Sequence, residues 1–199
     1  MYTLTMKLTK KQQVELKAKE LFWKYGFKKV TIDEICKKAN VSRKTFYTFY
    51  DNKSALVIYL LQQMTDEMML AYNEIIGSNR TFSEKMESLL MLKYESSNQF
   101  SMEFVADFFH PDSDDILAFY TKIVQESLTL TNDFFREAQK NGEMNQDLDI
   151  NFVMLMMQKM MEIGTAPEVM TLFSDAETMT RQLSQFVIYG VMPVKPIHN

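Results

Sequence analysis

The sequence has little that breaks a helix or cross-links a chain: 5 glycines, 4 prolines and 1 cysteine among 199 residues. The single cysteine, Cys36, excludes an internal disulfide framework and suits a reducing compartment. So few glycines and prolines, without evenly spaced turns, exclude a β-sandwich and favour helices. We therefore expect an all-α protein with about nine helices.

Catalytic and metal-binding patterns are also absent. The chain has 2 histidines: His110 precedes a proline, and His198 lies beside the last residue. No glycine-rich phosphate loop, nucleophile elbow or cluster of cysteine and histidine occurs. The sequence therefore predicts that the protein is not an enzyme and uses no metal or cofactor.

Long apolar runs are missing as well. The most apolar segment, 152–157, is far too short to span a bilayer, and the lysines near the N-terminus flank no apolar core of a signal peptide. We expect a cytoplasmic protein that does not associate with a membrane.

Charge is divided unevenly along the chain. Residues 1–55 hold 13 basic and 5 acidic side chains, a net charge of +8, whereas the remainder holds 9 basic and 21 acidic, a net charge of −12. A positive lobe attracts polyanions such as nucleic acid, although a solvated face of lysines would give the same count.

The N-terminal part predicts three helices, at about 9–25, 32–39 and 43–50, from apolar residues spaced three and four apart. Gly26 is a natural left-handed stop for the first helix. Thr31 and Glu34 form a capping-box pattern at the second, Asn40 suits the tight turn after it, and Ser42 caps the third. Two short helices joined by a three-residue turn, the second basic and polar outside, suit a helix-turn-helix that lies in the major groove of DNA.

This helix-turn-helix pattern resembles that of a known protein family. Residues 26–56 closely resemble the N-terminal domain of the TetR (tetracycline repressor-like) family, and the resemblance extends over roughly residues 8–60. The matching positions are Gly26-Phe27, Thr31-Ile32, Glu34-Ile35, Val41-Ser42, Thr45-Phe46-Tyr47 and Lys53. The resemblance implies a helix-turn-helix DNA-binding domain at 1–55 and a helical ligand-sensing and dimerisation domain at 56–199.

Four positions depart from the family pattern. Cys36 stands where alanine is usual, which favours a buried structural thiol over a redox sensor. Asn40 replaces the turn glycine, Lys44 replaces a frequent glycine, and Phe49 replaces a frequent histidine. Lys44 therefore adds a charge where the recognition helix begins.

Side-chain chemistry and the family register together select the DNA contacts, which are Thr31, Ser42, Arg43, Lys44, Thr45, Tyr47, Thr48 and Lys53. We expect Thr31, Ser42, Tyr47 and Lys53 to contact phosphates, and the residues that begin the third helix, 43–45, to read bases. The alternative is that Tyr47 only packs and Lys53 only faces solvent.

Two C-terminal segments predict a dimer. Residues 152–161 are apolar nearly all round a helix, so we expect a second chain to cover one face, and the last helix adds another apolar stripe. The expected interface residues are Val153, Met157, Met160, Met161, Met179, Leu183, Phe186 and Val187. A monomer with one thick core is the alternative. A two-fold dimer would place two recognition helices against a palindromic operator.

The resemblance also implies a pocket for an inducer between these regions. Its candidate lining is Met64, Met68, Met86, Leu90, Tyr94, Phe100, Glu103, Phe104, Asp107, Phe108, Tyr120 and Ile123. Aromatic and methionine side chains line adaptable pockets, but the same stripes form ordinary cores. Glu103 and Asp107 favour a cationic or hydrogen-bonding ligand if they point inward, and form a solvated face if they point outward.

Together these features predict a transcriptional regulator, a repressor that a small-molecule inducer releases from a palindromic operator. The fourth helix, 53–76, is the expected transmitter because it joins the DNA-binding domain to the pocket. Activation is an open alternative, and so is a DNA-binding adaptor of the nucleoid or cell-division type that needs no ligand. A filled core would favour the adaptor, and an apolar cavity would favour the inducible repressor.

Overall fold

The computed structural model describes residues 8–164 and 166–191, with backbone only at 161, 187, 188, 190 and 191. These residues form helices without any strand, as the sequence predicts. The helices are α1 (Lys10–Tyr25), α2 (Ile32–Ala39), α3 (Arg43–Tyr47), α4 (Lys53–Ile76), α5 (Phe82–Ser97), α6 (Met102–Phe109), α7 (Asp114–Lys140), α8 (Ile150–Gly164), α9 (Pro167–Met170) and α10 (Ala176–Val191). The described residues thus form ten helices, whereas the sequence predicts about nine.

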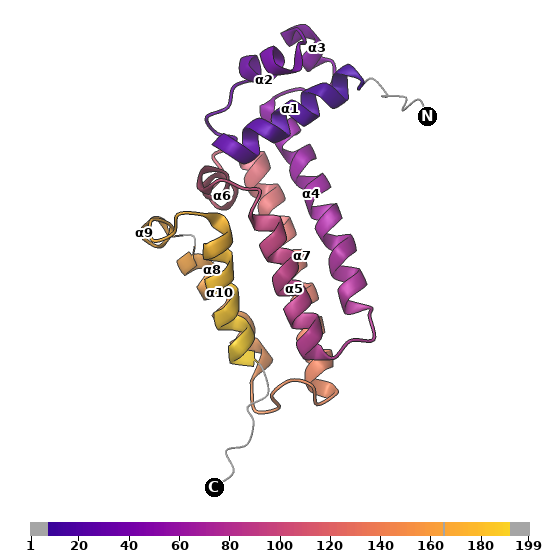
Figure 1. The fold of residues 1–199 in the computed structure, drawn as a ribbon, viewed down its shortest axis with the longest axis vertical. Coiled ribbons are helices and arrows are strands. Elements are labelled where there is room, and N and C mark those ends of the chain that lie inside the picture. Colours follow the sequence, from indigo (N-terminus) through magenta and orange to yellow (C-terminus); the bar gives the residue numbers. More distant parts are fainter. Residues whose placement is uncertain (1–7, 165, 192–199) are drawn as a thin grey trace, which may run out of the picture.

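The first three helices lie across one end of the molecule, above the longer helices that follow (Figure 1). Apolar side chains at three- and four-residue spacing hold them together: Val14, Ala18 and Phe22 of α1 meet Ile35 of α2 and Phe46 of α3, all with none of their surface exposed. Burial of the Phe46 ring fixes the short α3, which has too few residues to be stable alone.

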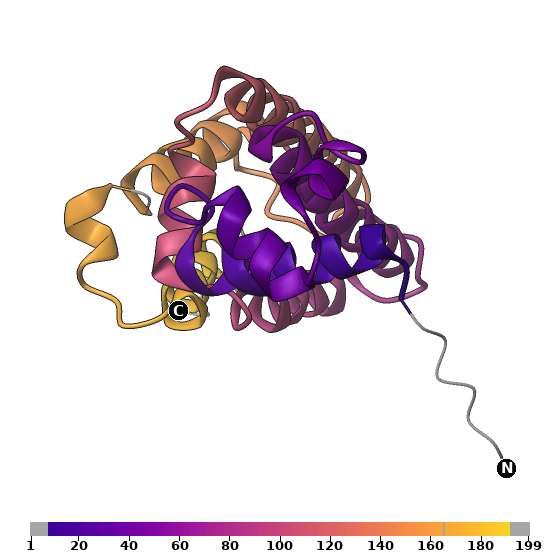
Figure 2. The same ribbon diagram turned by 90° about the horizontal axis from the view of Figure 1, so that it is seen from above.

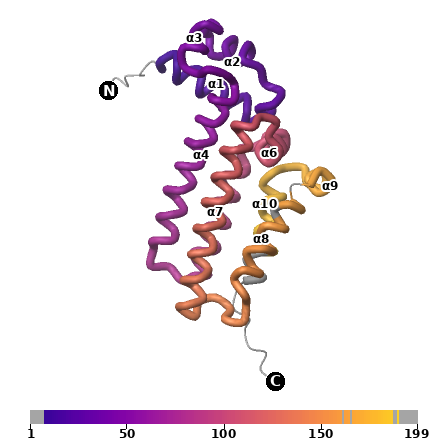
Figure 3. Tube along the Cα trace, turned by 180° about the vertical axis from the view of Figure 1, so that it is seen from behind, coloured from indigo at the N-terminus to yellow at the C-terminus, as the bar shows by residue number. Residues whose placement is uncertain are grey.

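The longer helices α4, α5, α7, α8 and α10 run side by side beneath them (Figures 1 and 3). Close packing links α4 to α5 and α7, α7 to α8, α8 to α10, and α10 to α5. These neighbour pairs close a ring. Seen from above, α1 to α3 cover one end of the bundle and α9 projects from its side (Figure 2).

The buried side chains form three clusters. The first cluster packs the helices α1, α2 and α3 against the N-terminal part of α4, and it includes Phe104 of α6 and Ile116 of α7. The second lies at the far end of the bundle, where the rings of Phe82 and Phe135 have centroids 6.3 Å apart. The third joins α6 to α10 through Val105, Ala176 and Met179.

One helix boundary differs from the sequence prediction for a local reason. The α3 helix ends at Tyr47 and not Tyr50, because the Thr48 hydroxyl and backbone N–H donate to the Thr45 carbonyl and tighten the chain into a turn. The α6 helix begins at Met102, and just before it the backbone N–H of Ser101 donates to the carbonyl of Trp23 on α1.

Candidate functional site

The turn between α2 and α3 has the geometry of a helix-turn-helix. Asn40 adopts the left-handed conformation, with φ of 52° and ψ of 49°, and the backbone N–H of Val41 donates to the Cys36 carbonyl. The Ser42 hydroxyl then accepts from the Thr45 backbone N–H at 3.1 Å and caps α3. Left-handed Asn40 and the Ser42 cap together reverse the chain within three residues.

The outer face of α3 is polar and cationic. Arg43, Lys44, Tyr47 and Thr48 are exposed, and Thr45 is half-buried. Their exposure follows from burial of Phe46, because Phe46 anchors the opposite side of the same short helix. The Arg43 guanidinium lies 3.4 Å from the Asp33 carboxylate of α2, a pair exposed to solvent that a competing partner can open at little cost.

Three of the expected phosphate contacts also have structural partners. The Thr31 hydroxyl and Glu34 carboxylate form a reciprocal capping box at α2, and the Ser42 hydroxyl caps α3. The Lys53 ammonium donates to the backbone carbonyls of Lys28 at 3.0 Å and Val30 at 3.1 Å, and so holds the loop before α2 against the start of α4. Two of its three N–H groups are thus used within the chain.

A polar junction ties α6 to the loop after α1. The Asp107 carboxylate accepts a hydrogen bond from the Lys28 backbone N–H at 2.8 Å and lies 3.9 Å from the Lys28 ammonium. That ammonium also donates to the His110 carbonyl. Asp107 therefore does not line the middle of the bundle, and Glu103, one turn away, is exposed.

Gly26 makes this junction possible. Its φ of 77° and ψ of 157° lie in a region that only glycine occupies readily, and not in the left-handed helical region that the sequence analysis expected. A Cβ atom at this position would lie 2.4 Å from the Asp107 carboxylate oxygen and 3.1 Å from the Glu103 carbonyl oxygen. The unusual ψ angle turns the chain so that the Lys28 N–H reaches α6.

Cys36 packs within the first cluster, 5% exposed, and burial raises the pKa of its thiol. A protonated, enclosed thiol is a poor nucleophile, which agrees with the structural role expected from the sequence. Within the described ranges, histidine, cysteine, aspartate and glutamate nowhere form a group that could hold a metal ion. None of the helices described there is long and apolar enough to cross a membrane.

Between the first and second clusters the inner faces of the helices are incompletely covered. On α4 the buried Leu56 and Leu60 are followed on the same face by Met64 and Met68, which are only half-buried. On α7 the buried face that contains Ile116 and Phe135 continues through half-buried residues.

At the centre of that α7 face lies Ser127, which is exposed. Steps of four, three and four residues lead from Ile116 through positions 120 and 123 to Ser127, a spacing that keeps to one side of a helix. A residue that shares the buried face of its helix and still has accessible surface is not covered by packing there, as the lining of a hollow between the helices would be. The core is thus interrupted in the middle of the bundle.

The twelve residues expected around a pocket divide into three groups. Met68, Tyr94, Tyr120 and Ile123 are half-buried, and Met64 and Leu90 are half-buried at the edges of the first and second clusters. Phe100, Phe104 and Phe108 form an aromatic stack with Trp23 under the N-terminal helices, and Met86 is buried in the second cluster. Glu103 and Asp107 lie at the junction described above.

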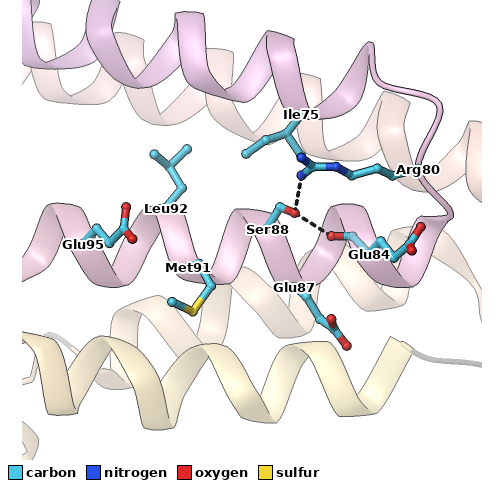
Figure 4. A pocket seen from close by; sticks show the side chains of 8 residues that line it. All are labelled: Ile75, Arg80, Glu84, Glu87, Ser88, Met91, Leu92 and Glu95. Atoms are coloured by element: carbon cyan, nitrogen blue, oxygen red, sulfur yellow. Dashed lines mark hydrogen bonds between the residues drawn. The ribbon is translucent and has the colours of Figure 1, made fainter.

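A separate groove of about 560 Å³ lies on the outer side of α5, where Ile75, Arg80, Glu84, Glu87, Ser88, Met91, Leu92 and Glu95 line it (Figure 4). The Arg80 guanidinium donates to the Ser88 hydroxyl at 2.7 Å, and that hydroxyl donates to the Glu84 carbonyl. Glu84, Glu87 and Glu95 of this groove are exposed, so water can hydrate their carboxylates.

An exposed apolar face remains on α8 and α10. On α8 it consists of Phe152, Leu155, Met156 and Ile163, between 44% and 59% exposed; α10 contributes Phe186 and Tyr189, 78% and 76% exposed. Of the interface residues expected from the sequence, Phe186 lies on this face. Val153 and Met179 are buried in the chain's own clusters, Met157, Met160 and Leu183 are half-buried, and the side chains of Met161 and Val187 lie outside the described residues.

A helix-turn-helix with a cationic outer helix, carried on an all-helical bundle, defines a DNA-binding transcriptional regulator and not an enzyme. Residues 17–60 match the model of the family described as bacterial regulatory proteins, tetR family. This N-terminal segment of the chain is therefore similar to the DNA-binding domain of the TetR family.

Similarity to known proteins extends beyond this segment. The chain is 21% identical over 173 residues to the uncharacterised HTH-type transcriptional regulator YdgC of Bacillus subtilis, an alignment that covers 84% of this chain and 85% of YdgC. The fold is similar to that of the fatty acid degradation regulator FadR from Bacillus halodurans, with a TM-score of 0.70, 17% identity and coverage of 94% and 98% of the two chains. It is also similar to that of FadR from Bacillus subtilis in complex with stearoyl-CoA, with a TM-score of 0.68, 17% identity and coverage of 89% and 97%.

Proposed function

We propose that the protein is a cytoplasmic, homodimeric repressor that leaves a palindromic operator when a small molecule enters a hollow between α4, α5 and α7. The interrupted core carries this proposal, because an adaptor without a ligand has no need to leave the middle of its bundle unfilled. The FadR of Bacillus subtilis was solved in complex with stearoyl-CoA, so a regulator of similar fold does bind a small molecule.

The exposed face of α8 and α10 supports the dimer. Four large apolar side chains are exposed on one side of α8, and soluble proteins commonly cover such side chains with a partner. A two-fold pairing through this patch would present two α3 helices to successive major grooves, with Arg43 and Lys44 at the base edges and Tyr47 and Lys53 at phosphates.

Two connections would couple the hollow to DNA. The α4 helix runs from Lys53 at the DNA-binding end to Met68 at the hollow. The α6 junction, through Asp107 and Lys28, adds a second connection. A ligand that binds better to the conformation in which the two α3 helices are misaligned lowers operator affinity by that same difference in affinity.

The test starts by isolating genomic fragments that the purified protein binds and defining the protected operator. Metabolites related to the adjacent genes are then titrated into the protein–operator complex, and release is followed by fluorescence anisotropy. The proposal expects at least one to release the operator, and Met68→Trp, which fills the hollow, to abolish release while operator binding persists. Met91→Trp, on the outer side of α5, is the matched control. If Met68→Trp still responds fully to the ligand, the hollow is not the sensing site.

A further inference from the structure

A lysine lies on the buried face of α5. Steps of four, three, four and four residues lead from Phe82 through Met86 and position 89 to Lys93 and Ser97, so these side chains share one side of the helix. Phe82, Met86 and Ser97 are buried, at 2%, 6% and 8% exposure. Lys93 sits at the centre of the same face and yet is exposed.

Protein surrounds Lys93 closely enough to lower the pKa of its ammonium, and no neighbouring charge contributes to the change. Among the described residues no carboxylate or carbonyl oxygen bonds to the ammonium. Accessible surface on the same side of α5 as the buried Phe82, Met86 and Ser97 is what a lysine facing the proposed hollow would have.

The height of Lys93 along the bundle agrees with this position. At about 1.5 Å per residue, Lys93 lies about 16 Å along α5 from Phe82, and Ser127 lies about 12 Å along α7 from Phe135. Phe82 and Phe135 touch in the second cluster, and both helices lead from there toward the N-terminal end. Lys93 and Ser127 therefore lie at similar heights along the bundle.

We propose that Lys93 binds the anionic head group of an inducer whose body is apolar, with the half-buried side chains of Met68, Leu90 and Ile123 around that body. This inference rests on the proposed ligand site and names the class of ligand. It differs from the cationic or hydrogen-bonding ligand that inward-pointing Glu103 and Asp107 would favour, because Asp107 is committed to the α6 junction and Glu103 is exposed. An unpaired, enclosed ammonium gains a strong hydrogen bond and a charge partner from a carboxylate or phosphate.

The proposal is tested by calorimetry with four probes that share a ten-carbon chain: decanoate, decyl phosphate, decanol and decylamine. The wild-type protein is measured without DNA. The tighter-binding of the two anions is expected to bind about 10- to 100-fold more tightly than decanol. Decylamine is expected to bind most weakly. The comparison of the two anions identifies the head group. Equal binding of decanol and both anions, or no binding by any probe, overturns the proposal.

Three variants assign the preference to Lys93. Lys93→Met, close to lysine in length, is expected to lose the preference for the anion and to keep decanol binding. Lys93→Arg retains the charge and should retain the preference. Lys122→Met, on the outer side of α7 where Lys122 pairs with Glu126, is the matched control and should bind all probes as the wild type does. A folded Lys93→Met variant that still prefers the anion overturns the assignment.

A direct readout comes from NMR of isotopically methylated lysines, in which the resonance missing from Lys93→Met belongs to Lys93. Saturating anion is expected to raise the pKa of this group, because an opposite charge favours the protonated form. Operator release is measured separately. Binding of the anion through Lys93 without release of DNA would contradict the inducible repressor and leave the present inference standing.

Discussion

Replacing Gly26 by alanine should disrupt the connection between the DNA-binding helices and α6. The backbone conformation, with φ of 77° and ψ of 157°, costs a non-glycine residue about 1–3 kcal/mol. The added Cβ would also sit 2.4 Å from the Asp107 carboxylate oxygen and displace it from the Lys28 N–H. Loss of a charge-assisted bond of this kind adds about 1.5–3 kcal/mol.

We therefore expect Gly26→Ala to lower the free energy of unfolding by about 3–5 kcal/mol, which for a chain of this length lowers Tm by roughly 10 °C. Urea denaturation followed by circular dichroism measures the change. Gly142→Ala is the matched control: Gly142 also has a positive φ, of 74°, but a Cβ there would meet nothing within 4 Å. The control should lose only about 1 kcal/mol.

A double-mutant cycle separates strain from contact. Asp107→Ala alone should cost about 2 kcal/mol, because the Lys28 N–H loses its partner. Since the two changes break the same bond, Gly26→Ala with Asp107→Ala should cost about 2 kcal/mol less than the sum of the single effects. Strict additivity of the two costs, or a Gly26→Ala protein as stable as the wild type, would refute the account of this junction.

Three further outcomes follow from the described geometry. Arg43→Ala should weaken binding to the operator by about 10- to 100-fold and binding to random DNA much less, as measured by anisotropy; equal losses on both would refute base reading by Arg43. Leu155→Glu, which places a charge on the exposed face of α8, should shift the protein to monomers in sedimentation equilibrium, whereas Glu87→Gln on the outer side of α5 should not. The Cys36 thiol, whose pKa is raised by burial, should react with a disulfide reagent at pH 8 at least about 100-fold more slowly than free cysteine, and reaction at the free rate would contradict its enclosure.

Local features were readable from the sequence because their causes lie within a few residues. The Thr31–Glu34 capping box, left-handed Asn40 and the Ser42 cap each involve neighbours along the chain, and all three are present. Contacts between distant segments were not readable. The bond from the Lys28 N–H to Asp107 joins residues 79 positions apart, and nothing near either residue marks it.

The interior of the bundle illustrates the same limit. The spacing of Phe82, Met86 and Ser97 places Lys93 on one face with them. A lysine within an apolar stripe does not by itself indicate which way the side chain faces, because that depends on how the surrounding helices pack. Likewise, a segment that is apolar all round does not reveal which side faces a partner. Packing of α8 against α7 and α10 turns Val153 inward and leaves Phe152 and Leu155 outside.

The central claim is that two cationic α3 helices, presented by a dimer, bind double-stranded DNA. It is tested most directly by measuring the affinity for duplex DNA over a range of salt concentrations, together with the mass of the complex. If Arg43, Lys44 and Lys53 of each subunit each displace one counterion, the logarithm of the association constant should fall with the logarithm of salt with a slope of about −5, and two chains should bind each duplex. A protein that remains monomeric and shows no salt-sensitive association with any duplex would contradict the account.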